Sequence, residues 1–155
     1  MKNLNITVME NNFYKLPLKF DSVFENTDEY LKTCSEKESI DQFLETLIMT
    51  CPGEHKFDRE FGCKIWEMDF VRMTSPVNWE KDFRNYLLEA IGKFEHRITD
   101  VDVTASIVEE TQEDSLYKSV SIKKRATVII KTKLVSTGEN VAFYYTMYLG
   151  PISSK

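Results

Sequence analysis

The sequence predicts an α+β fold in which helices pack on one face of a small, mainly antiparallel sheet of three or more strands. Two segments, 35–50 and 78–94, carry apolar residues at helical spacing. The last third of the chain instead alternates apolar and polar residues, which is typical of half-buried strands. Gly138 lies between two of these alternating runs and indicates a hairpin.

The N-terminal region is expected to contribute little to the core. Residues 1–12 are polar, so we expect them to be frayed and flexible. Residues 13–24 alternate only weakly and contain Pro17, which favours an extended edge segment over a helix.

The first long helix is predicted over 35–50. Ser35 followed three residues later by Glu38 is the pattern of a capping box, which marks a helix start. Pro52 and Gly53 should end the helix, because proline cannot continue it and glycine accepts the backbone angles of a corner. The expected buried face consists of Ile40, Phe43, Leu44, Leu47 and Ile48.

A short helix is predicted over 58–68, with Asp58 as its N-cap. Its inward face would hold Phe61, Ile65 and Trp66. Gly62 is expected to let another element pass close by, because glycine lacks a Cβ atom. Residues 72–77 are predicted to be a loop.

The second long helix is predicted over 78–94, with Asn78 as its N-cap. Its apolar stripe is wide, which predicts that the helix lies across a sheet. The stripe consists of Trp79, Phe83, Tyr86, Leu87, Ala90, Ile91 and Phe94.

The remainder is a predicted meander of strands around 101–107, 126–135 and 141–149. Residues 111–115 and 136–140 are predicted to be loops. Residues expected to share a face within each strand are Val101, Val103, Ala105 and Ile107; Ala126, Val128, Ile130, Thr132 and Leu134; and Val141, Phe143, Tyr145, Met147 and Leu149.

Composition favours a globular protein with a single domain over 1–155. Apolar residues make up 42% and charged residues 29% of the chain. No apolar run reaches the length of a membrane span, and the N-terminus does not resemble a signal peptide, so we expect a cytoplasmic protein without direct membrane insertion. The net charge of −5 argues against nucleic acid as a partner.

The sequence offers no catalytic or cofactor motif, so we expect no catalytic residues, no cofactor and no metal. Cys51, His55 and Cys63 could be drawn as metal ligands, but their spacing matches no common zinc pattern. A weak enzyme alternative is a cell-wall glycoside hydrolase, because Glu60 and Asp69, followed by a hydroxyl at Ser75, nearly match the spacing of small phage lysozymes.

Glu95, His96 and Arg97 follow the second long helix directly. A glutamate and an arginine that flank one residue can form a local ion pair. An arginine there also interacts favourably with the helix dipole. Alternatively, both side chains can project together from a tight corner towards a partner. The residues alone leave these interpretations open.

Three segments together resemble a known family. They are T-x-P-G-E, here Thr50 to Glu54; an F-G pair at 61–62; and E-x-R at 95–97, directly after a helix that ends A-I-x-x-F. This pattern resembles the baseplate wedge family of contractile phage tails, also called the tail lysozyme-like family, whose type VI secretion member is TssE. The resemblance covers residues 40–110 well and the C-terminal strands more loosely.

The resemblance implies a structural, non-enzymatic subunit of a contractile injection system. Such a subunit connects wedge proteins, similar to TssF, TssG and TssK, to the first sheath ring, built of subunits similar to TssB and TssC, and lies near the inner tube. It would template sheath assembly at a bacterial, membrane-docked baseplate. The expected protein-binding residues are Glu95, His96 and Arg97, with Gly53 and Glu54 forming a second contact or bracing the corner.

The sequence departs from the family pattern at two positions. His96 stands where the family usually has proline, and His55 stands where it usually has arginine. The first change loosens the corner but keeps both charges, and the second removes an expected charge. The compact length favours a secretion system over a phage tail.

Overall fold

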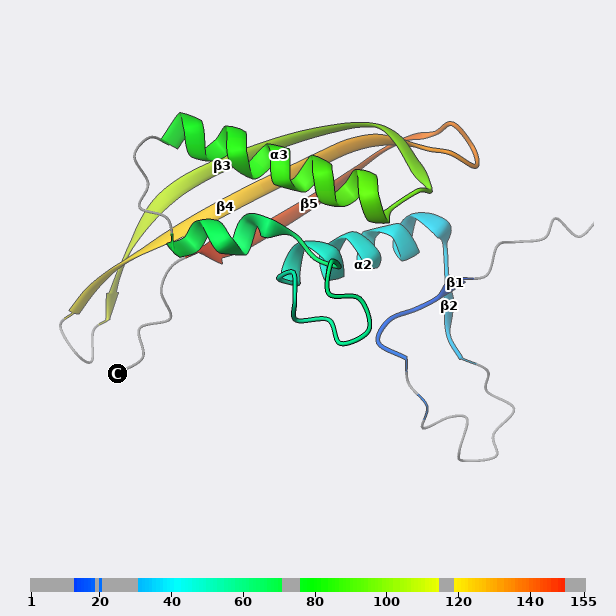
Figure 1. Cartoon of the computed structure of the whole chain (residues 1–155), viewed down its shortest axis with the longest axis horizontal. Helices are drawn as coiled ribbons and strands as arrows, with labels where there is room; N and C mark the ends of the chain where they lie inside the picture. Colours follow the sequence, from blue (N-terminus) through cyan, green and yellow to red (C-terminus); the bar gives the residue numbers. More distant parts are fainter. Residues whose placement is uncertain (1–12, 19, 21–30, 71–75, 115–118, 150–155) are drawn as a thin grey trace, which may run out of the picture. The chain divides into compact units, whose positions relative to one another are not determined.

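The computed structural model describes residues 13–18, 20, 31–70, 76–114 and 119–149. Its elements are β1 (Phe13–Tyr14), β2 (Thr33–Cys34), α2 (Glu36–Met49), the 3₁₀ helix η1 (Lys64–Phe70), α3 (Pro76–Phe94), β3 (Ile98–Asp114), β4 (Ser119–Leu134) and β5 (Asn140–Leu149) (Figure 1). The α+β fold class is therefore confirmed.

The chain divides into two compact units, Met1–Gln42 and Phe43–Lys155. The boundary falls inside α2, which is a continuous helix. The organisation as a single domain over 1–155 stays a prediction, and the frayed segment 1–12 lies outside the described residues.

The first unit contains a two-stranded antiparallel sheet in which Phe13 pairs with Cys34. Beside it, the ammonium of Lys15 lies 2.6 Å from a carboxylate oxygen of Glu38, and the backbone N–H of Leu16 donates to the side-chain oxygen of Gln42. The extended segment predicted at 13–24 is thus a strand of two residues, and its positions 19 and 21–24 lie outside the described residues.

Helix α2 begins where the sequence predicts. Ser35 precedes its first residue, and its hydroxyl accepts a hydrogen bond of 3.2 Å from the backbone N–H of Glu38. This is one half of the predicted capping box, because the carboxylate of Glu38 pairs with Lys15 instead. The helix ends at Met49, ahead of Pro52.

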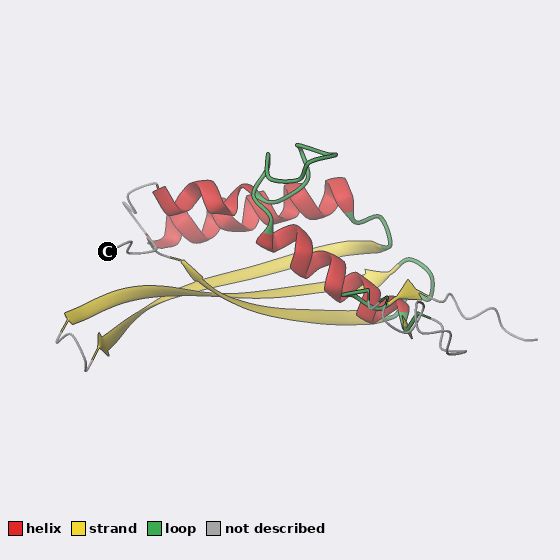
Figure 2. Ribbon diagram, turned by 90° about the horizontal axis from the view of Figure 1, so that it is seen from below, coloured by secondary structure: helices red, strands yellow, loops and turns green. Residues whose placement is uncertain are grey.

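In the second unit, α3 and η1 lie on one face of the sheet with strand order β3-β4-β5 (Figure 2). In β4, the residues predicted to share one face are buried at every second position from Ala126 to Leu134. In β5, every second residue from Val141 to Met147 is buried in the same way. Fully or nearly fully buried side chains of α3 include Trp79, Phe83, Leu87, Ala90 and Ile91. The predicted packing of helices on one face is confirmed.

The short helix predicted over 58–68 is wrong at its start, because η1 begins only at Lys64. Asp58 does not cap a helix. Its carboxylate accepts a hydrogen bond of 2.9 Å from the backbone N–H of Glu60, within a turn. Gly62 then has φ of +127°, a conformation that no right-handed helix contains.

The second long helix begins at Pro76, so Asn78 lies in its first turn and is not the N-cap. Proline suits the first helical position because its fixed φ is helical and it has no N–H to leave unpaired. The predicted loop at 72–77 therefore loses its last two residues to α3, and its residues 72–75 lie outside the described part.

Strand β3 continues through Asp114, so the loop predicted at 111–115 is wrong for its first four residues. Thr111 pairs with Ile122 and Asp114 with Ser119 in an unbroken antiparallel register. Pairing with β4 overrides the low strand propensity of these polar residues. The predicted hairpin is confirmed, with Gly138 at φ of +71°, and its loop ends at Glu139 because Asn140 already pairs with Lys133 in β5.

Candidate functional site

The segment from Glu95 to Arg97 connects α3 to β3 and forms a tight ionic clasp. The backbone N–H of Glu95 still donates to the carbonyl of Ile91, as in the last turn of a helix. Two guanidinium nitrogens of Arg97 donate to the two carboxylate oxygens of Glu95, at 2.9 and 2.5 Å. The backbone N–H of Arg97 donates to the same carboxylate at 2.9 Å. This bidentate geometry is the strong form of an ion pair.

Burial separates the roles of the three residues. Glu95 is only 4% exposed, so its carboxylate faces Arg97 and not a partner. The side chain of Arg97 is 29% exposed and His96 is exposed. The local ion pair is therefore present and fixes the direction in which Arg97 meets the surface, whereas contact with a partner stays a prediction.

Gly53 and Glu54 form the corner that follows α2. Gly53 has φ of +96°, and its backbone N–H donates to the carbonyl of Arg59 at 2.8 Å. The carboxylate of Glu54 accepts a hydrogen bond of 2.9 Å from the backbone N–H of Cys51. Both residues are exposed. Glu54 thus braces the corner that it belongs to.

Gly62 provides the close approach that its position predicts. A Cβ atom there would lie 2.5 Å from the carbonyl oxygen of Thr50 and 3.0 Å from backbone atoms of Cys51 and Pro52. Directly beside it, the backbone N–H of Cys63 donates to the same Thr50 oxygen at 2.8 Å. The two ends of the corner are held together because residue 62 has no side chain.

An aromatic cluster joins the corner to the ionic clasp. The ring of Phe61 lies 5.9 Å from that of Phe43 and 5.3 Å from that of Phe94, between ring centroids. The guanidinium carbon of Arg97 lies 5.8 Å from the centroid of Phe43. The structure therefore brings both predicted segments onto one aromatic support, although they are more than thirty residues apart.

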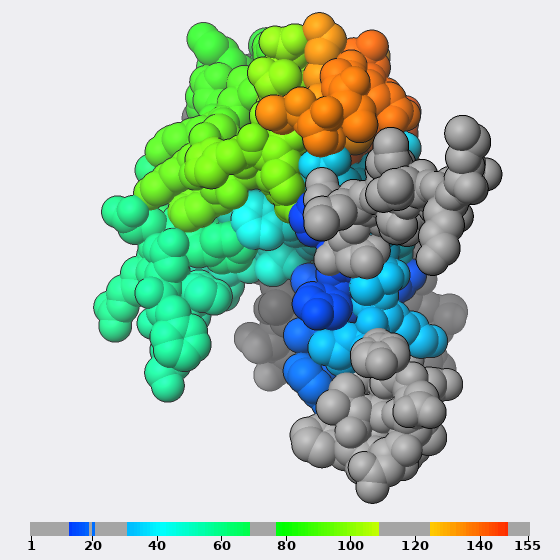
Figure 3. Space-filling view, turned by 90° about the vertical axis from the view of Figure 1, so that its right-hand side faces the viewer, coloured from blue at the N-terminus to red at the C-terminus, as the bar shows by residue number. Residues whose placement is uncertain are grey.

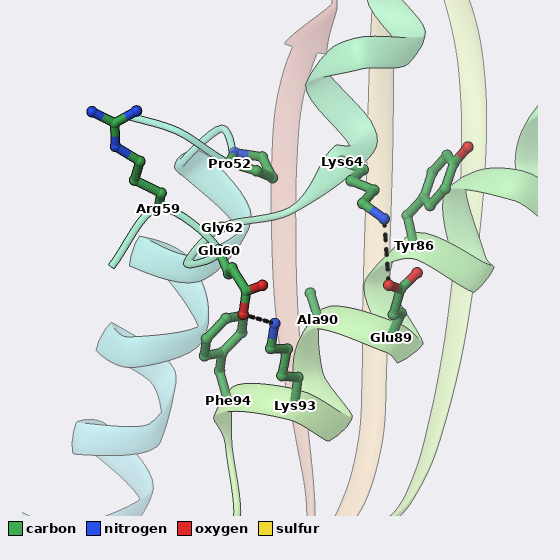
Figure 4. Close-up of a pocket in the computed structure, with 10 residues that line it drawn as sticks. All are labelled: Pro52, Arg59, Glu60, Gly62, Lys64, Tyr86, Glu89, Ala90, Lys93 and Phe94. Atoms are coloured by element: carbon green, nitrogen blue, oxygen red, sulfur yellow. Dashed lines mark hydrogen bonds and ion pairs between the residues drawn. The ribbon is translucent and has the colours of Figure 1, made fainter. Parts of the chain in front are cut away.

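A hollow of about 340 Å³ lies between the corner and α3 (Figure 4). Two ion pairs lie along it, Lys93 with Glu60 at 2.7 Å and Lys64 with Glu89 at 3.4 Å. The hydrogen bond that the Lys93 ammonium donates to the Glu60 carboxylate raises the pKa of Lys93, so this ammonium stays charged. The sequence does not predict these pairs, because Glu60 and Lys93 lie on segments that only the fold brings together.

The residues proposed for metal or glycosidase chemistry do not form such sites in the described part of the chain. Burial raises the pKa of Cys63 to about 11, which keeps its thiol protonated. No group of three or more potential metal ligands occurs among the described residues. Glu60 is 77% exposed and ion-paired with Lys93, whereas the side chain of Asp69 and all of Ser75 lie outside the described residues.

The two outer strands of the three-stranded sheet differ in how open their edges are. The register of β3 shifts between Thr99 and Asp102, a bulge in which Asp100 has φ of +53°. Further along, the carboxylate of Glu80 on α3 accepts the backbone N–H of Ile107 at 3.2 Å. Bulges and capped N–H groups are devices that protect an edge from further pairing.

Strand β5 has none of the interruptions seen in β3. Its register with β4 is continuous from Lys133–Asn140 to Lys124–Leu149, and no described strand pairs with its other side. On the sheet face away from α3, Tyr144 is 69% exposed and Tyr148 is 60% exposed. β5 is therefore a regular, tyrosine-bearing open edge.

No helix among the described residues is long and apolar enough to cross a membrane.

Comparison with known proteins identifies one family. The family model described as "Baseplate wedge protein gp25" matches residues 34–132, more than half of the chain. Comparison with curated proteins finds no match.

Two solved structures are similar in fold. A crystal structure of a protein described as a tail lysozyme from Geobacter sulfurreducens has 18% sequence identity and a TM-score of 0.57, covering 80% of this chain and all of that one. A chain in a structure of the baseplate complex from the type VI secretion system has 19% identity and a TM-score of 0.49, covering 72% of this chain and 91% of that one.

Proposed function

The chain belongs to the baseplate wedge protein gp25 family and is a structural baseplate component, and we propose that it links wedge proteins to the first sheath ring and templates sheath assembly. In this proposal, the three-stranded sheet accepts a strand from a sheath subunit at β5. The ionic clasp of Glu95 and Arg97, with His96 and the Gly53–Glu54 corner, meets the wedge proteins.

The observation that carries the sheath contact is the open edge of β5. An extended peptide can add to such an edge through backbone hydrogen bonds, and neighbouring side chains then select it. β5 offers ten residues in continuous register. Exposed tyrosines beside the edge supply large, amphipathic contact area of the kind that is enriched in protein interfaces.

The support for the wedge contact is the way in which the clasp is built. A buried carboxylate that holds a partly exposed guanidinium fixes the donors of Arg97 in one orientation. Preorganised donors bind a partner at lower entropic cost. Phe61, whose neighbour Gly62 packs against the backbone of Pro52, belongs to the same aromatic cluster as Phe43, and Phe43 lies beside Arg97. The proposal therefore assigns the corner and the clasp to one partner surface.

Within this family we place the chain in a type VI secretion baseplate, as a TssE-like subunit. Its wedge partners would be proteins similar to TssF, TssG and TssK, and its sheath partners proteins similar to TssB and TssC, at the cytoplasmic side of a docked baseplate. The T-x-P-G-E and E-x-R segments support the family. The choice of a secretion system over a phage tail is part of this proposal.

The cell-wall glycoside hydrolase alternative is not favoured. A general acid of a glycosidase needs a site that excludes water and raises the pKa of the carboxyl group. Glu60 is 77% exposed and bonded to Lys93. The description of the Geobacter protein as a tail lysozyme belongs to that protein, and at 18% identity the likeness shows the fold alone.

The sheath proposal is tested by placing a charge beside the open edge. Tyr144→Lys should leave the fold intact, because this side chain is 69% exposed, and should lower sheath nucleation on purified baseplates about tenfold. The measurement is the number of sheaths that form, counted by electron microscopy.

The matched control is Thr104→Lys on β3. Thr104, Ile129 and Tyr144 lie in one cross-strand row, so the two lysines occupy equivalent positions at opposite edges of the same face. The control should nucleate sheaths normally. Equal loss in both variants, or no loss in Tyr144→Lys, would contradict strand addition at β5.

A further inference from the structure

The segment 51–63, here named the Phe57 loop, carries the most exposed large apolar side chain of the described residues. Phe57 is 88% exposed. The loop stands out from the surface of its unit, away from the three-stranded sheet (Figures 2 and 3). A phenylalanine in this position gains almost nothing from folding, because its ring stays in water.

The Phe57 loop is nevertheless internally ordered by hydrogen bonds. The backbone N–H of Cys63 donates a hydrogen bond of 2.8 Å to the carbonyl of Thr50, which joins the ends of the loop. The backbone N–H of Gly53 donates one of 2.8 Å to the carbonyl of Arg59, which joins its two sides. At the tip, the backbone N–H of Asp58 donates to Nδ1 of His55 at 3.1 Å. A loop closed in this way holds its tip in a defined geometry, which lowers the entropic cost of docking.

A chain of rings connects the tip to the body of the unit. The ring centroids of His55 and Phe57 are 6.2 Å apart, and those of His55 and Phe61 are 5.3 Å apart. Phe61 in turn packs against Phe94 of α3. The His55 ring thus lies between the exposed ring of Phe57 and the ring of Phe61.

The tip, residues 55–59, carries a formal charge of +1 although the whole chain carries −5, because Lys56 and Arg59 are opposed there by Asp58 alone. The three carboxylates of the loop are engaged within the molecule: Glu54 by Cys51 N–H, Asp58 by Glu60 N–H, and Glu60 by Lys93. Lys56 and Arg59 have no ion-pair partner among the described residues, and Lys56 lies 5.8 Å from the ring of Phe57. Arg59 lines the hollow, and Figure 4 shows its guanidinium directed away from the ion pair of Glu60 and Lys93.

We propose that the Phe57 loop is a preformed knob that inserts Phe57 into an apolar pocket of a protein partner whose rim carries carboxylates, which pair with Lys56 and Arg59. The partner is a wedge protein of the baseplate, so this inference rests on the proposed function. An aromatic anchor flanked by basic groups has the composition of an interface hot spot.

An anionic membrane surface is the competing occupant for an aromatic and basic tip. One ring and two cations give weak membrane attachment, because stable anchoring requires more buried apolar area or more charge. The acidic balance of the chain also opposes an anionic bilayer. A protein pocket fits the observations better.

The test measures binding of the purified full chain to purified wedge proteins of the same baseplate. Phe57→Ser should raise the Kd at least about tenfold, because it removes the anchor. The side chain is exposed, so circular dichroism should be unchanged. The matched control is Val77→Ser, which removes a side chain that is 73% exposed at the start of α3 and should bind within about twofold of the parent.

A second variant, which lacks both basic side chains of the tip, tests the carboxylates proposed on the rim of the partner's pocket. Lys56→Ala with Arg59→Ala should weaken binding and also reduce its salt dependence, because carboxylates on the rim would lose both partners. If the parent chain binds and Phe57→Ser binds equally well, the proposed insertion of Phe57 is contradicted, whereas the proposed function is not. A parent chain that binds no wedge protein overturns both. Sedimentation with phosphatidylglycerol vesicles that depends on Phe57 would assign the tip to a membrane and also overturns this proposal.

Discussion

Substitutions at three glycines of this chain distinguish the energetic cost of backbone strain from that of a steric clash. Gly62 has a positive φ and no room for a Cβ atom, Gly53 has a positive φ and open space, and Gly92 lies in a helix with open space. The same substitution at each position therefore measures a different combination of effects.

Gly62→Ala should lower the free energy of unfolding by about 2–4 kcal/mol, because strain and a backbone clash add together. Gly53→Ala should cost about 1 kcal/mol from strain alone. Gly92→Ala should stabilise by about 0.5–1 kcal/mol, since alanine is the better helix former. Urea denaturation measures all three values. Equal effects at Gly62 and Gly53 would mean that the corner relaxes to admit a methyl group.

The ionic clasp predicts an asymmetry between its two partners. Arg97→Ala leaves a buried carboxylate with only a backbone N–H, and should cost about 2–3 kcal/mol of unfolding free energy. Glu95→Ala leaves a guanidinium that can reach water and should cost less, about 1 kcal/mol. The double variant should cost less than the sum. A double-mutant cycle in urea makes this comparison, and additive losses would show that the pair is not coupled.

The same variants test the wedge contact once their stability is known. Glu95→Ala with Arg97→Ala should remain folded and lose co-purification with wedge proteins. Arg97→Lys is the matched control, because it keeps the charge but loses the bidentate geometry. Normal retention of wedge proteins by the folded double variant would remove the clasp from the interface.

At the scale of elements, the sequence predicts most where the pattern is long. The stripe from Trp79 to Ile91 is enough to place α3 across a sheet, and the alternation from Ala126 to Leu134 assigns the buried face of β4. Even Thr132, a polar residue in that alternation, is buried as the alternation predicts, because its hydroxyl donates to the carbonyl of Thr99 at 2.6 Å.

The wrong predictions share a cause. In each, the residue types suggest one local structure, but other residues of the chain impose a different one. Asp58 looks like a helix cap, but the backbone turn at Gly62 prevents a helix from running through these residues. Residues 111–114 look like a loop, but β4 pairs with each of them. The residue type determines the intrinsic strand propensity of a segment, whereas the strand that pairs with it is known only from the fold.

The candidate site was predictable in part for the same reason. Gly53, Glu54, Glu95 and Arg97 are conspicuous in the sequence, yet the aromatic cluster that joins them requires Phe43, Phe61 and Phe94 to meet in space. Phe57 gave one available signal, an aromatic residue among charges between two glycines. Its exposure could not be derived from that signal, because a loop aromatic folds inward as readily as outward.

At the scale of the whole molecule, the two compact units share the helix α2. A single domain predicts one cooperative transition, because a continuous helix cannot unfold in one unit without losing its hydrogen bonds at the boundary. Both tryptophans, Trp66 and Trp79, lie in the second unit, and Cys34 lies in the first. The chain thus contains a separate probe for each unit.

Tryptophan fluorescence and the thiol reactivity of Cys34 should therefore change at the same urea concentration. A chain with Cys51→Ser and Cys63→Ser isolates the signal of Cys34. Both transitions are measured in this variant, because Cys63 is fully buried and its substitution by serine lowers the stability of the second unit. The fluorescence transition of the parent chain gives the size of that shift. Reactivity of Cys34 that rises before the fluorescence changes would show two domains, contrary to the prediction from the sequence.

The unequal edges of the three-stranded sheet set the valency of the subunit. In the proposed function, the regular strand β5 accepts a strand, and β3, which is interrupted by a bulge and capped by Glu80, does not. Copies of such a subunit cannot chain into a fibre by edge-to-edge addition. Each copy therefore adds a strand at β5 and none at β3. A polymer that grows from it by strand addition extends in a single direction.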